Sequence, residues 1–287
     1  MSSVLYDEPG PRAKRVTLYA SVVAAVLVAG LLFVVYRRLD ENSQFSAARW
    51  SPLLNPGDED FPAVWRLLGV GIRNTLTAAV LAIVASLAVG TLLASLRLLA
   101  GRVSRLPLIG LIELLRGVPV LIMIYLVSRV LPLYGADFDN QLWYLVIGLT
   151  LYNSVVIAEI VRAGVASLPR GQNEAALAVG MTPSQSLRLV QLPQAFRVML
   201  PSLISQLIVV LKDTSLGFII LYGETLRTAN LIIQETKNPI QMYLVIGALF
   251  VLTNYALGRF AQYTERRLSR SSSAAAVNEP LPANEGV

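Results

Sequence analysis

The chain has 287 residues, of which 55% are hydrophobic and only 15% are charged, and its net charge is +6. A soluble domain averages about 25% charged residues, so this composition predicts a chain solvated mostly by lipid. There is no cysteine and no histidine, which excludes disulfide bonds, zinc sites built on these residues and catalytic triads that need them. The positive charges lie between hydrophobic runs, mostly on one side of the membrane, so no nucleic acid is needed to explain them.

The N-terminal segment predicts a membrane anchor. Residues 1–15 are polar and contain Arg12, Lys14 and Arg15, and the stretch over residues 16–36 carries no charge. A stretch of this length can cross a hydrocarbon core of about 30 Å. A cleaved signal peptide is the alternative, but its hydrophobic region is about 7–15 residues long. Because this stretch is longer and lacks a convincing cleavage site, we predict a span with the N-terminus in the cytoplasm.

Residues 37–68 are polar and are predicted to form an extracytoplasmic loop. Within it, Phe61, Trp65 and Leu68 are spaced to lay a short helix on the outer membrane surface. Hydrophobic runs predict five further spans, over residues 69–96, 107–131, 142–165, 198–221 and 240–260. The run over 107–131 is interrupted by polar residues and by Pro119. The end of the chain, residues 268–287, is predicted to be a disordered cytoplasmic tail.

The distribution of basic residues predicts the orientation. Loops assigned to the inner side carry 13 lysines and arginines and those assigned to the outer side carry six, leaving aside charges inside spans. The inner set is Arg12, Lys14, Arg15, Arg97, Arg102, Arg105, Arg170, Arg188, Arg197, Arg259, Arg266, Arg267 and Arg270, and the outer set is Arg37, Arg38, Arg49, Arg66, Arg227 and Lys237. Cytoplasmic loops are enriched in basic residues. Both termini and the loop over 169–197 are therefore predicted to be cytoplasmic, although Arg37 and Arg38 oppose this bias.

The loop over residues 169–197 carries complete helix signals. A first short helix is predicted to start near Gly171, with Glu174 in its first turn, where negative charge suits the helix dipole. Gly180 is placed to end it, because glycine tolerates the left-handed conformation. Thr182 is placed to cap a second helix, with Pro183 at its first position and Gln185 completing a capping box. Two short helices joined at a glycine make a compact exposed surface, either for docking a partner or as an ordinary amphipathic connector.

This loop resembles a family signature. Glu174-Ala175-Ala176, Gly180 and Val190-Gln191-Leu192-Pro193 resemble the cytoplasmic loop of ABC importer permeases, with valine where isoleucine is commoner. Further segments resemble the polar amino acid subfamily, which takes histidine, glutamate, glutamine, arginine and their relatives: Arg116-Gly117-Val118-Pro119, Ala158-Glu159-Ile160-Val161-Arg162 and Lys212-Asp213-Thr214-Ser215-Leu216. The similarity covers about residues 69–267, with Ala163 in place of a commoner glycine. Residues 4–11 and the added first span look like the actinobacterial glutamate-type permease.

The resemblance implies an all-α polytopic membrane protein with six transmembrane helices, a five-span importer core over 69–267 plus the N-terminal span, and a cytoplasmic coupling helix. The residues it assigns to coupling are Glu174, Ala175, Ala176, Gly180, Leu192 and Pro193. The partners it implies are two copies of an ATP-binding subunit, a second permease subunit that is a related chain or a second copy, and an extracytoplasmic solute-binding protein. The implied function is ATP-driven import of a polar amino acid, glutamate first, across the cytoplasmic membrane.

The chain itself carries no GxxxxGK[ST] phosphate-binding loop, so hydrolysis of ATP is assigned to the separate subunit. The chain is thus not predicted to be an enzyme, and no catalytic, cofactor-binding or metal-binding residue is assigned. An ion-coupled secondary transporter or a channel is the main alternative, because charges inside spans can couple an ion to a solute. It leaves the loop unexplained, and no inverted repeat is evident. A membrane enzyme is a more distant alternative, since no nucleophile and base form a recognisable pair.

Polar residues inside two spans are candidates for the substrate path. Lys212 lies 12 residues from Leu200, roughly 18 Å into the membrane at the helical rise, where a charge costs several kcal/mol unless it is paired or hydrated. In one interpretation Lys212 and Asp213 tie spans or subunits together. In the other the helix loosens there, Lys212 attracts the solute carboxylate, Asp213 attracts its ammonium, and the hydroxyls of Thr214 and Ser215 complete the shell. Glu159 and Arg162 are further candidates, with a structural ion pair as their alternative role.

Overall fold

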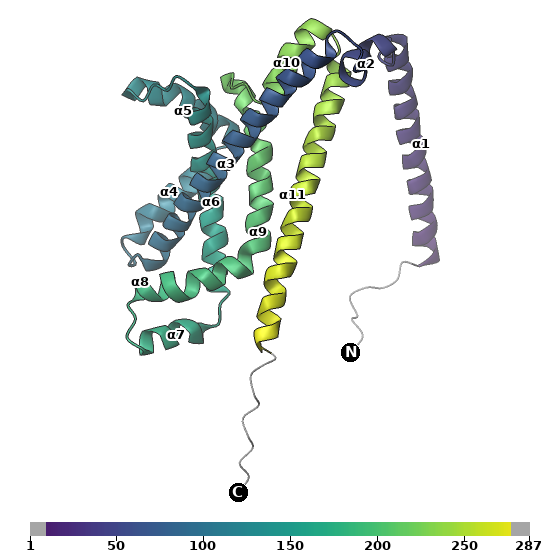
Figure 1. The fold of residues 1–287 in the computed structure, drawn as a ribbon. Helices are drawn as coiled ribbons and strands as arrows, with labels where there is room; N and C mark the ends of the chain where they lie inside the picture. The colour runs from purple at the N-terminus through teal and green to yellow at the C-terminus, as the bar shows by residue number, and fades with distance from the viewer. Residues whose placement is uncertain (1–9, 277–287) are drawn as a thin grey trace.

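The computed structural model describes residues 10–276, with side chains up to residue 259 and at Tyr263. Every regular element in this part of the chain is a helix, which confirms the predicted all-α architecture (Figure 1). In chain order the elements are α1 (Pro11–Glu41), α2 (Ala47–Leu54), α3 (Phe61–Leu99), α4 (Arg105–Gly117), α5 (Val120–Val130), η1 (Leu131–Tyr134), α6 (Gln141–Ala166), α7 (Arg170–Ala178), α8 (Pro183–Gln185), η2 (Ser186–Gln191), α9 (Leu192–Asp213), η3 (Thr214–Ile220), α10 (Thr225–Thr236) and α11 (Pro239–Ala276). Of the elements labelled η, η1 and η3 are 3-10 helices and η2 is a π-helix.

Five helices in the described chain are long and apolar enough to cross a membrane, and the pair α4 and α5 makes a sixth span if it is counted as one. This agrees with the six predicted spans, but the span expected over 107–131 is two helices bent by 103°. The bend has a local cause. Val118 precedes Pro119 and has extended backbone angles, φ −87° and ψ 125°, as the ring of a following proline demands. Helix α4 therefore ends at Gly117, and α5 starts in a new direction.

The segment over residues 37–68 is more helical than the predicted loop. Helix α1 continues to Glu41, α2 follows, and α3 begins at Phe61 rather than near Gly69. The expectation of a separate interfacial helix over Phe61, Trp65 and Leu68 is wrong, because these residues form the first turns of α3. Leu68 is fully buried, and the Trp65 indole donates a hydrogen bond to the Leu53 carbonyl at 3.1 Å. Contact with α2 thus extends α3 beyond its hydrophobic run.

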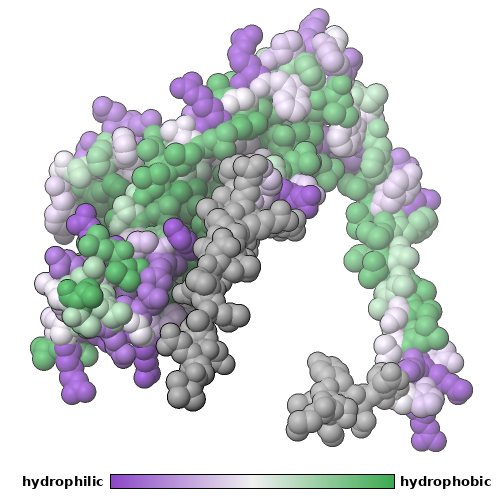
Figure 2. All heavy atoms as spheres, turned by 60° about the horizontal axis from the view of Figure 1, so that its bottom comes forward, coloured by the Kyte–Doolittle hydropathy of each residue, from purple (hydrophilic) through white to green (hydrophobic). Residues whose placement is uncertain are grey.

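Helix α1 stands apart from the other helices and is joined to them through α2 (Figure 1). None of its residues is buried, and hydrophobic side chains cover most of its length (Figure 2). Hydrogen bonds fix the linker that follows it. The Asn238 amide donates to the Arg49 carbonyl at 3.1 Å, the Arg49 guanidinium donates to the Lys237 carbonyl at 3.1 Å, and the Gln241 amide donates to the Gln44 carbonyl. These contacts tie the residues around the start of α11 to α2 and to the segment just before it.

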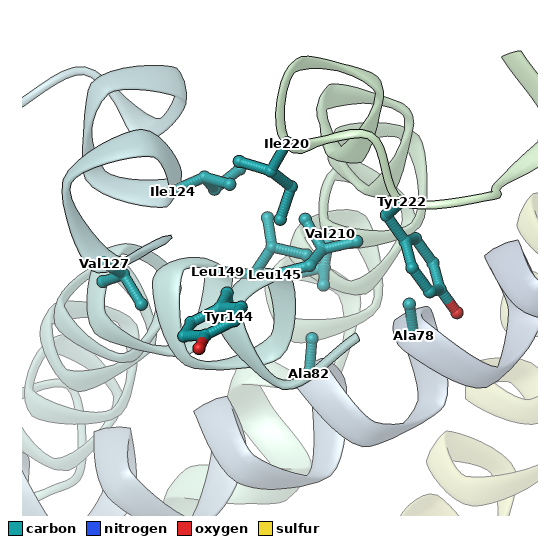
Figure 3. Packing of buried hydrophobic residues seen from close by; sticks show 10 residues of the cluster. All are labelled: Ala78, Ala82, Ile124, Val127, Tyr144, Leu145, Leu149, Val210, Ile220 and Tyr222. Atoms are coloured by element: carbon teal, nitrogen blue, oxygen red, sulfur yellow. The ribbon is translucent and has the colours of Figure 1, made fainter. Parts of the chain in front are cut away.

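The core is built around α6. The apolar window of α6 is 61% buried, against 33% or less for the other candidate spans. Figure 3 shows a core cluster that joins α6 to α3, α5, α9 and the chain after it, made of Ala78, Ala82, Ile124, Val127, Tyr144, Leu145, Leu149, Val210, Ile220 and Tyr222. Close approach of α3 depends on Gly90, where a Cβ would lie 2.7 Å from the Ser154 carbonyl oxygen and 2.8 Å from Ile157 Cγ2. Small residues on α3 therefore allow these two long helices to touch.

The two ends of the bundle differ in structure. The region expected as an outer loop, residues 222–239, contains α10. At the other end, α11 is helical to Ala276, where the sequence predicted a disordered tail from residue 268, and residues 277–287 lie outside the described part of the chain. The start of α1, the end of α11 and helix α7 all lie at this second end (Figure 1). A chain that crosses the membrane an even number of times begins and ends on the same side, and the positions of α1 and α11 agree with this.

Candidate functional site

Helix α7 and the turn after it have the predicted form. The helix begins at Arg170, one residue before Gly171, and Gly180 has a left-handed φ of +87°. Its amide donates to the Leu177 carbonyl at 3.0 Å, and the amide of Met181 donates to the Ala176 carbonyl at 3.1 Å, which satisfies the carbonyls at the end of the helix. The expectation that Glu174 lies in the first turn is wrong, because the earlier start places it beyond that turn.

The second helix begins with the predicted capping box. The Gln185 side-chain oxygen accepts from the Thr182 amide at 2.8 Å, and the Thr182 hydroxyl accepts from the Gln185 amide at 3.3 Å. The chain then widens into the π-helix over Ser186–Gln191 before α9 begins at Leu192. Pro193 lies in the first turn of α9, where its missing N–H is tolerated. The loop thus leads directly into a span without a flexible break.

Polar side chains that sequence reasoning did not single out join α7 to the π-helix. The Asn173 amide oxygen accepts from the Ser186 hydroxyl at 2.8 Å and from the Gln191 amide at 2.9 Å. The Gln191 amide also contacts the Ser186 hydroxyl at 3.1 Å, and the Gln194 amide donates to the Gln172 amide oxygen at 3.3 Å. Polar residues in a polar loop give no signal of such pairing in the sequence. The contacts make α7, the turn and the π-helix one connected unit, here called the loop unit (residues 169–197).

The six residues assigned to coupling divide by exposure. Glu174, Ala175, Gly180 and Pro193 are exposed, Ala176 is buried, and Leu192 is partly buried against Val165, Leu187 and Ala195. Large apolar side chains nearby are exposed as well, namely Leu177, Val179 and Leu189. The loop unit therefore offers a mixed apolar and charged surface, whereas Ala176 and Leu192 hold it together from within.

Glu159 and Arg162 lie in an ion-pair cluster that joins α6 to α3. The Glu159 carboxylate contacts the Arg97 guanidinium at 2.7 Å and the Arg162 guanidinium at 2.5 Å. The side chain of Arg97 is only 15% exposed. From the sequence, Arg97 is predicted to lie in a cytoplasmic loop. No residue near it in the sequence indicates that its partner is Glu159, 62 residues away. One oxygen of Glu159 accepts from Arg97 and the other accepts from Arg162. The cluster therefore links α3 to α6 through an ion pair.

The other candidate path residues lie where α9 ends. The α-helix stops at Asp213 and tightens into the 3-10 helix η3. The helix therefore changes form in this region, but by tightening and not by the loosening that was expected for a substrate site. Thr214 is fully buried and donates to the Leu211 carbonyl at 2.6 Å, and Ser215 donates to the Lys212 carbonyl at 2.8 Å. Lys212 is exposed, and within the described chain its ammonium makes no hydrogen bond or ion pair. In this part of the chain no hydrogen bond or ion pair joins these residues to Glu159 or Arg162.

A buried carboxylate at the opposite end was not anticipated. Glu224 is fully buried and caps α10, accepting from the amides of Leu226 and Arg227 at 2.7 Å each. Burial raises the pKa of Glu224 to about 7, while the two amide bonds act in the opposite direction. Burial and the charge of Glu224 also raise the pKa of Tyr222. Glutamate is less common than serine, threonine or aspartate at this cap position, so a cap at Glu224 is only weakly indicated by the local residues.

Comparisons with known proteins agree on one kind of membrane protein. The profile of the family described as "Binding-protein-dependent transport system inner membrane component" matches residues 86–270. The Glutamate transport system permease protein GluD of Corynebacterium glutamicum is 36% identical over 233 residues, 80% of this chain and 83% of that protein. The Glutamate/aspartate import permease protein GltK of Escherichia coli O6:H1 is 33% identical over 205 residues, 69% of this chain and 91% of that protein. A solved structure described as an amino acid ABC transporter with histidines is similar at 28% identity and a TM-score of 0.65, over 72% of this chain and 96% of that chain.

Proposed function

Because the chain belongs to the family of binding-protein-dependent transport system inner membrane components, we propose that it is a permease subunit of an ATP-driven importer of a polar amino acid, with glutamate as the leading candidate. The observation that carries the proposal is the geometry of the loop unit. A left-handed glycine, a capping box and side-chain hydrogen bonds hold an exposed surface rigidly at the start of α9. A surface that transmits motion needs this rigidity, since a flexible connector would absorb the motion.

In this proposal the loop unit docks on a separate ATP-binding subunit, one for each of two permease subunits. Glu174, Ala175 and Gly180 lie on the docking surface, and the exposed Leu177, Val179 and Leu189 supply the apolar contact area typical of an interface core. Ala176 and Leu192 support this surface from inside. Movement of the ATPase reaches the membrane through α9, because the π-helix continues into that helix without a loop.

The proposal places both chain termini and the loop unit in the cytoplasm. The basic residues support this orientation, and the start of α1, the end of α11 and α7 share one end of the molecule (Figure 1). Helix α10 and the α1–α2 linker then face the extracytoplasmic side, where a solute-binding protein delivers its cargo. The second permease subunit is either a related chain or a second copy of this one.

The substrate class is proposed from the names of relatives and from the charges. Both relatives above carry glutamate in their names, and Lys212 is an exposed cation within a span. Lys212 attracts the solute carboxylate, and Asp213 and Ser215 meet its ammonium and polar atoms. Thr214 is fully buried, unlike Ser215, so its hydroxyl shapes the helix end instead. Glu159 and Arg162 border the path only if their cluster with Arg97 opens during transport.

Uptake by the reconstituted complex tests the proposal. The chain is placed in liposomes together with its proposed partners, namely an ATPase, a second permease subunit and a solute-binding protein. The ATPase and ATP are inside the liposomes, and accumulation of labelled glutamate, glutamine and arginine inside them is measured. We expect accumulation that needs ATP and the ATPase, fastest for glutamate. Uptake that proceeds without the ATPase and collapses when the ion gradient is removed would instead establish the secondary transporter.

The role of Lys212 is tested in the same system by Lys212→Met. We expect the ATPase to dock normally while glutamate uptake is lost or its charge preference changes. Failure of the complex to assemble, or unchanged uptake kinetics for every amino acid, would leave Lys212 with a structural role only.

A further inference from the structure

The α9 segment between Ser202 and Asp213 has a polar face. Its polar side chains are those of Ser202, Ser205, Gln206, Lys212 and Asp213. At 3.6 residues per turn they fall within a sector of about 120° and extend over roughly 16 Å of helix. Ser202, Ser205 and Lys212 are exposed, and Gln206 and Asp213 are half-buried. These polar side chains therefore share one face of the helix.

The other side of the same helix is apolar. Leu203 and Val210 are buried in the bundle. Ile204, Leu207 and Ile208 line an apolar groove of about 410 Å³ together with residues of α3 and α11. Helix α9 therefore has an apolar side, which faces the bundle and the groove, and a polar side on the opposite surface at the same height.

The polar face is unsuited to lipid. The apolar core of α1, which is entirely exposed, carries no charge over residues 16–36, as a surface against lipid requires. The polar face of α9 instead carries the Lys212 ammonium, which costs several kcal/mol inside hydrocarbon unless it is hydrated or paired. Within the described chain it makes no hydrogen bond or ion pair. Its needs can be met by water, by a solute in water, or by an acidic group of a partner subunit.

Gln206 marks the border of this face. Its amide nitrogen donates to the side-chain oxygen of Asn153 on α6 at 2.7 Å, and Asn153 in turn donates to the Leu149 carbonyl at 2.9 Å. The bond fixes the orientation of the Gln206 amide. Its carbonyl oxygen is bonded by no group in the described part of the chain, so it remains free to accept a hydrogen bond from the polar side.

We propose that this face of α9 is one wall of a hydrated passage from Lys212 to the cytoplasmic end of the helix, with Ser202, Ser205 and Gln206 as its hydrogen-bonding positions. Between Lys212 and Ser202, towards the start of α9, the polar side chains of this wall are hydroxyls and one amide, and none is a carboxylate. A small amino acid with net negative charge is attracted by Lys212 and then meets no fixed charge on this wall between Lys212 and Ser202. The choice of an amino acid as solute rests on the proposed function, whereas the presence of water does not.

Cysteine labelling tests the inference, because the chain has no cysteine of its own. Ser202→Cys, Ser205→Cys and Val209→Cys place thiols on the polar face, since Val209 is exposed between them and Lys212. Ile204→Cys and Ile208→Cys are the matched controls on the apolar side. An anionic, membrane-impermeant methanethiosulfonate is added from the cytoplasmic side of membrane vesicles that contain the full complex. We expect the polar-face cysteines to react at least about tenfold faster than the controls, because only a hydrated thiol ionises to the reactive thiolate.

Each outcome decides one point. Equal rates on the two faces would overturn the passage, even if ATP-driven uptake is intact, and the polar face would then be an interface between subunits. Fast labelling of the polar face without any ATP-dependent uptake would support the hydrated wall and count against the proposed importer. Fast labelling that glutamate slows and arginine does not would support both the passage and its preference for an acidic solute.

Discussion

Glu224 shows how one side chain couples the α10 end of the molecule to pH. Its carboxylate has an ordinary pKa of 4.5, which burial raises to about 7 in the folded chain. Between these two values the folded form binds a proton that the unfolded form releases. The contribution of Glu224 to stability is therefore greatest at low pH and falls as the pH rises from about 4.5 to about 7, after which this contribution changes no further.

Hydrogen exchange of the α10 amides measures this dependence. After correction for the intrinsic exchange rate, we expect the free energy of opening to fall by at most about 1.4 kcal/mol per pH unit over this range. Glu224→Gln should remove the slope, because an amide does not titrate, and should lower the opening free energy by losing one of the two cap bonds. The same slope in both proteins would show that Glu224 is not the titrating group.

At the scale of residues, local pairs could be predicted from the sequence and distant pairs could not. The capping box of Thr182 and Gln185 follows from residues three positions apart, and Gly180 follows from its place at the end of a helix pattern. The contact between Arg97 and Glu159 joins two spans. It depends on how the helices pack, which hydrophobic runs alone do not specify.

At the scale of elements, the existence of the spans was predicted well and their limits less well. Hydrophobic runs identify the apolar core of each helix, but α3 gains two further turns through its contact with α2, and α11 extends into a polar region. The bend between α4 and α5 was signalled by Pro119. Its angle was not, because a proline limits the residue before it without fixing where the next helix packs.

The crossing of α3 and α6 leads to a prediction about helix packing. Gly90→Ala places a methyl 2.7 Å from a backbone oxygen of α6 and should destabilise the chain by about 1–3 kcal/mol, as overpacking does. Gly247→Ala is the control, because nothing lies within 4 Å of its added Cβ. It should be neutral or stabilising by about 0.5–1 kcal/mol, since alanine favours helix more than glycine. Thermal unfolding of both variants in detergent checks this, and equal midpoints would contradict the close crossing.

At the scale of the whole molecule, the proposed topology can be tested with single cysteines in this cysteine-free chain. Ala47→Cys lies on the proposed extracytoplasmic side and Ser104→Cys on the cytoplasmic side, and both positions are exposed. An impermeant thiol reagent added to intact cells should label the first and not the second. Ser104→Cys should react only after the cells are opened. The reverse labelling pattern would mean that the topology is inverted. The loop unit would then lie outside the cell, where no cytoplasmic ATPase could bind it.

The placement of α1 was beyond sequence reasoning, although its existence was not. Its charge-free run predicts a span, but none of its residues is buried, so core packing does not give its position. That position depends on contacts of the chain just after it, such as the ring contact of Tyr36 with Phe45 and the hydrogen bonds of Gln241 to Gln44 and of Asn238 to Arg49 in α2. Such contacts follow from the folded arrangement and not from any local pattern.

In the proposed importer, the loop unit must transmit force from an ATPase to α9. Gly180→Asp tests this claim, with Gly171→Asp as its control, because both add one carboxylate to the exposed surface of the loop unit and neither Cβ meets an atom within 4 Å. Gly171 lies in the first turn of α7, where a negative charge is favourable. At Gly180 the left-handed backbone adds about 1 kcal/mol of strain, and the new charge must be desolvated at the proposed interface.

The measurement is capture of the ATPase by the purified permease, followed by ATP-dependent glutamate uptake in the same liposomes. We predict that both variants insert into the membrane normally and that Gly171→Asp captures the ATPase and transports. Gly180→Asp should capture little ATPase and transport at background. Transport by Gly180→Asp at the parental rate would contradict the coupling role of the loop unit.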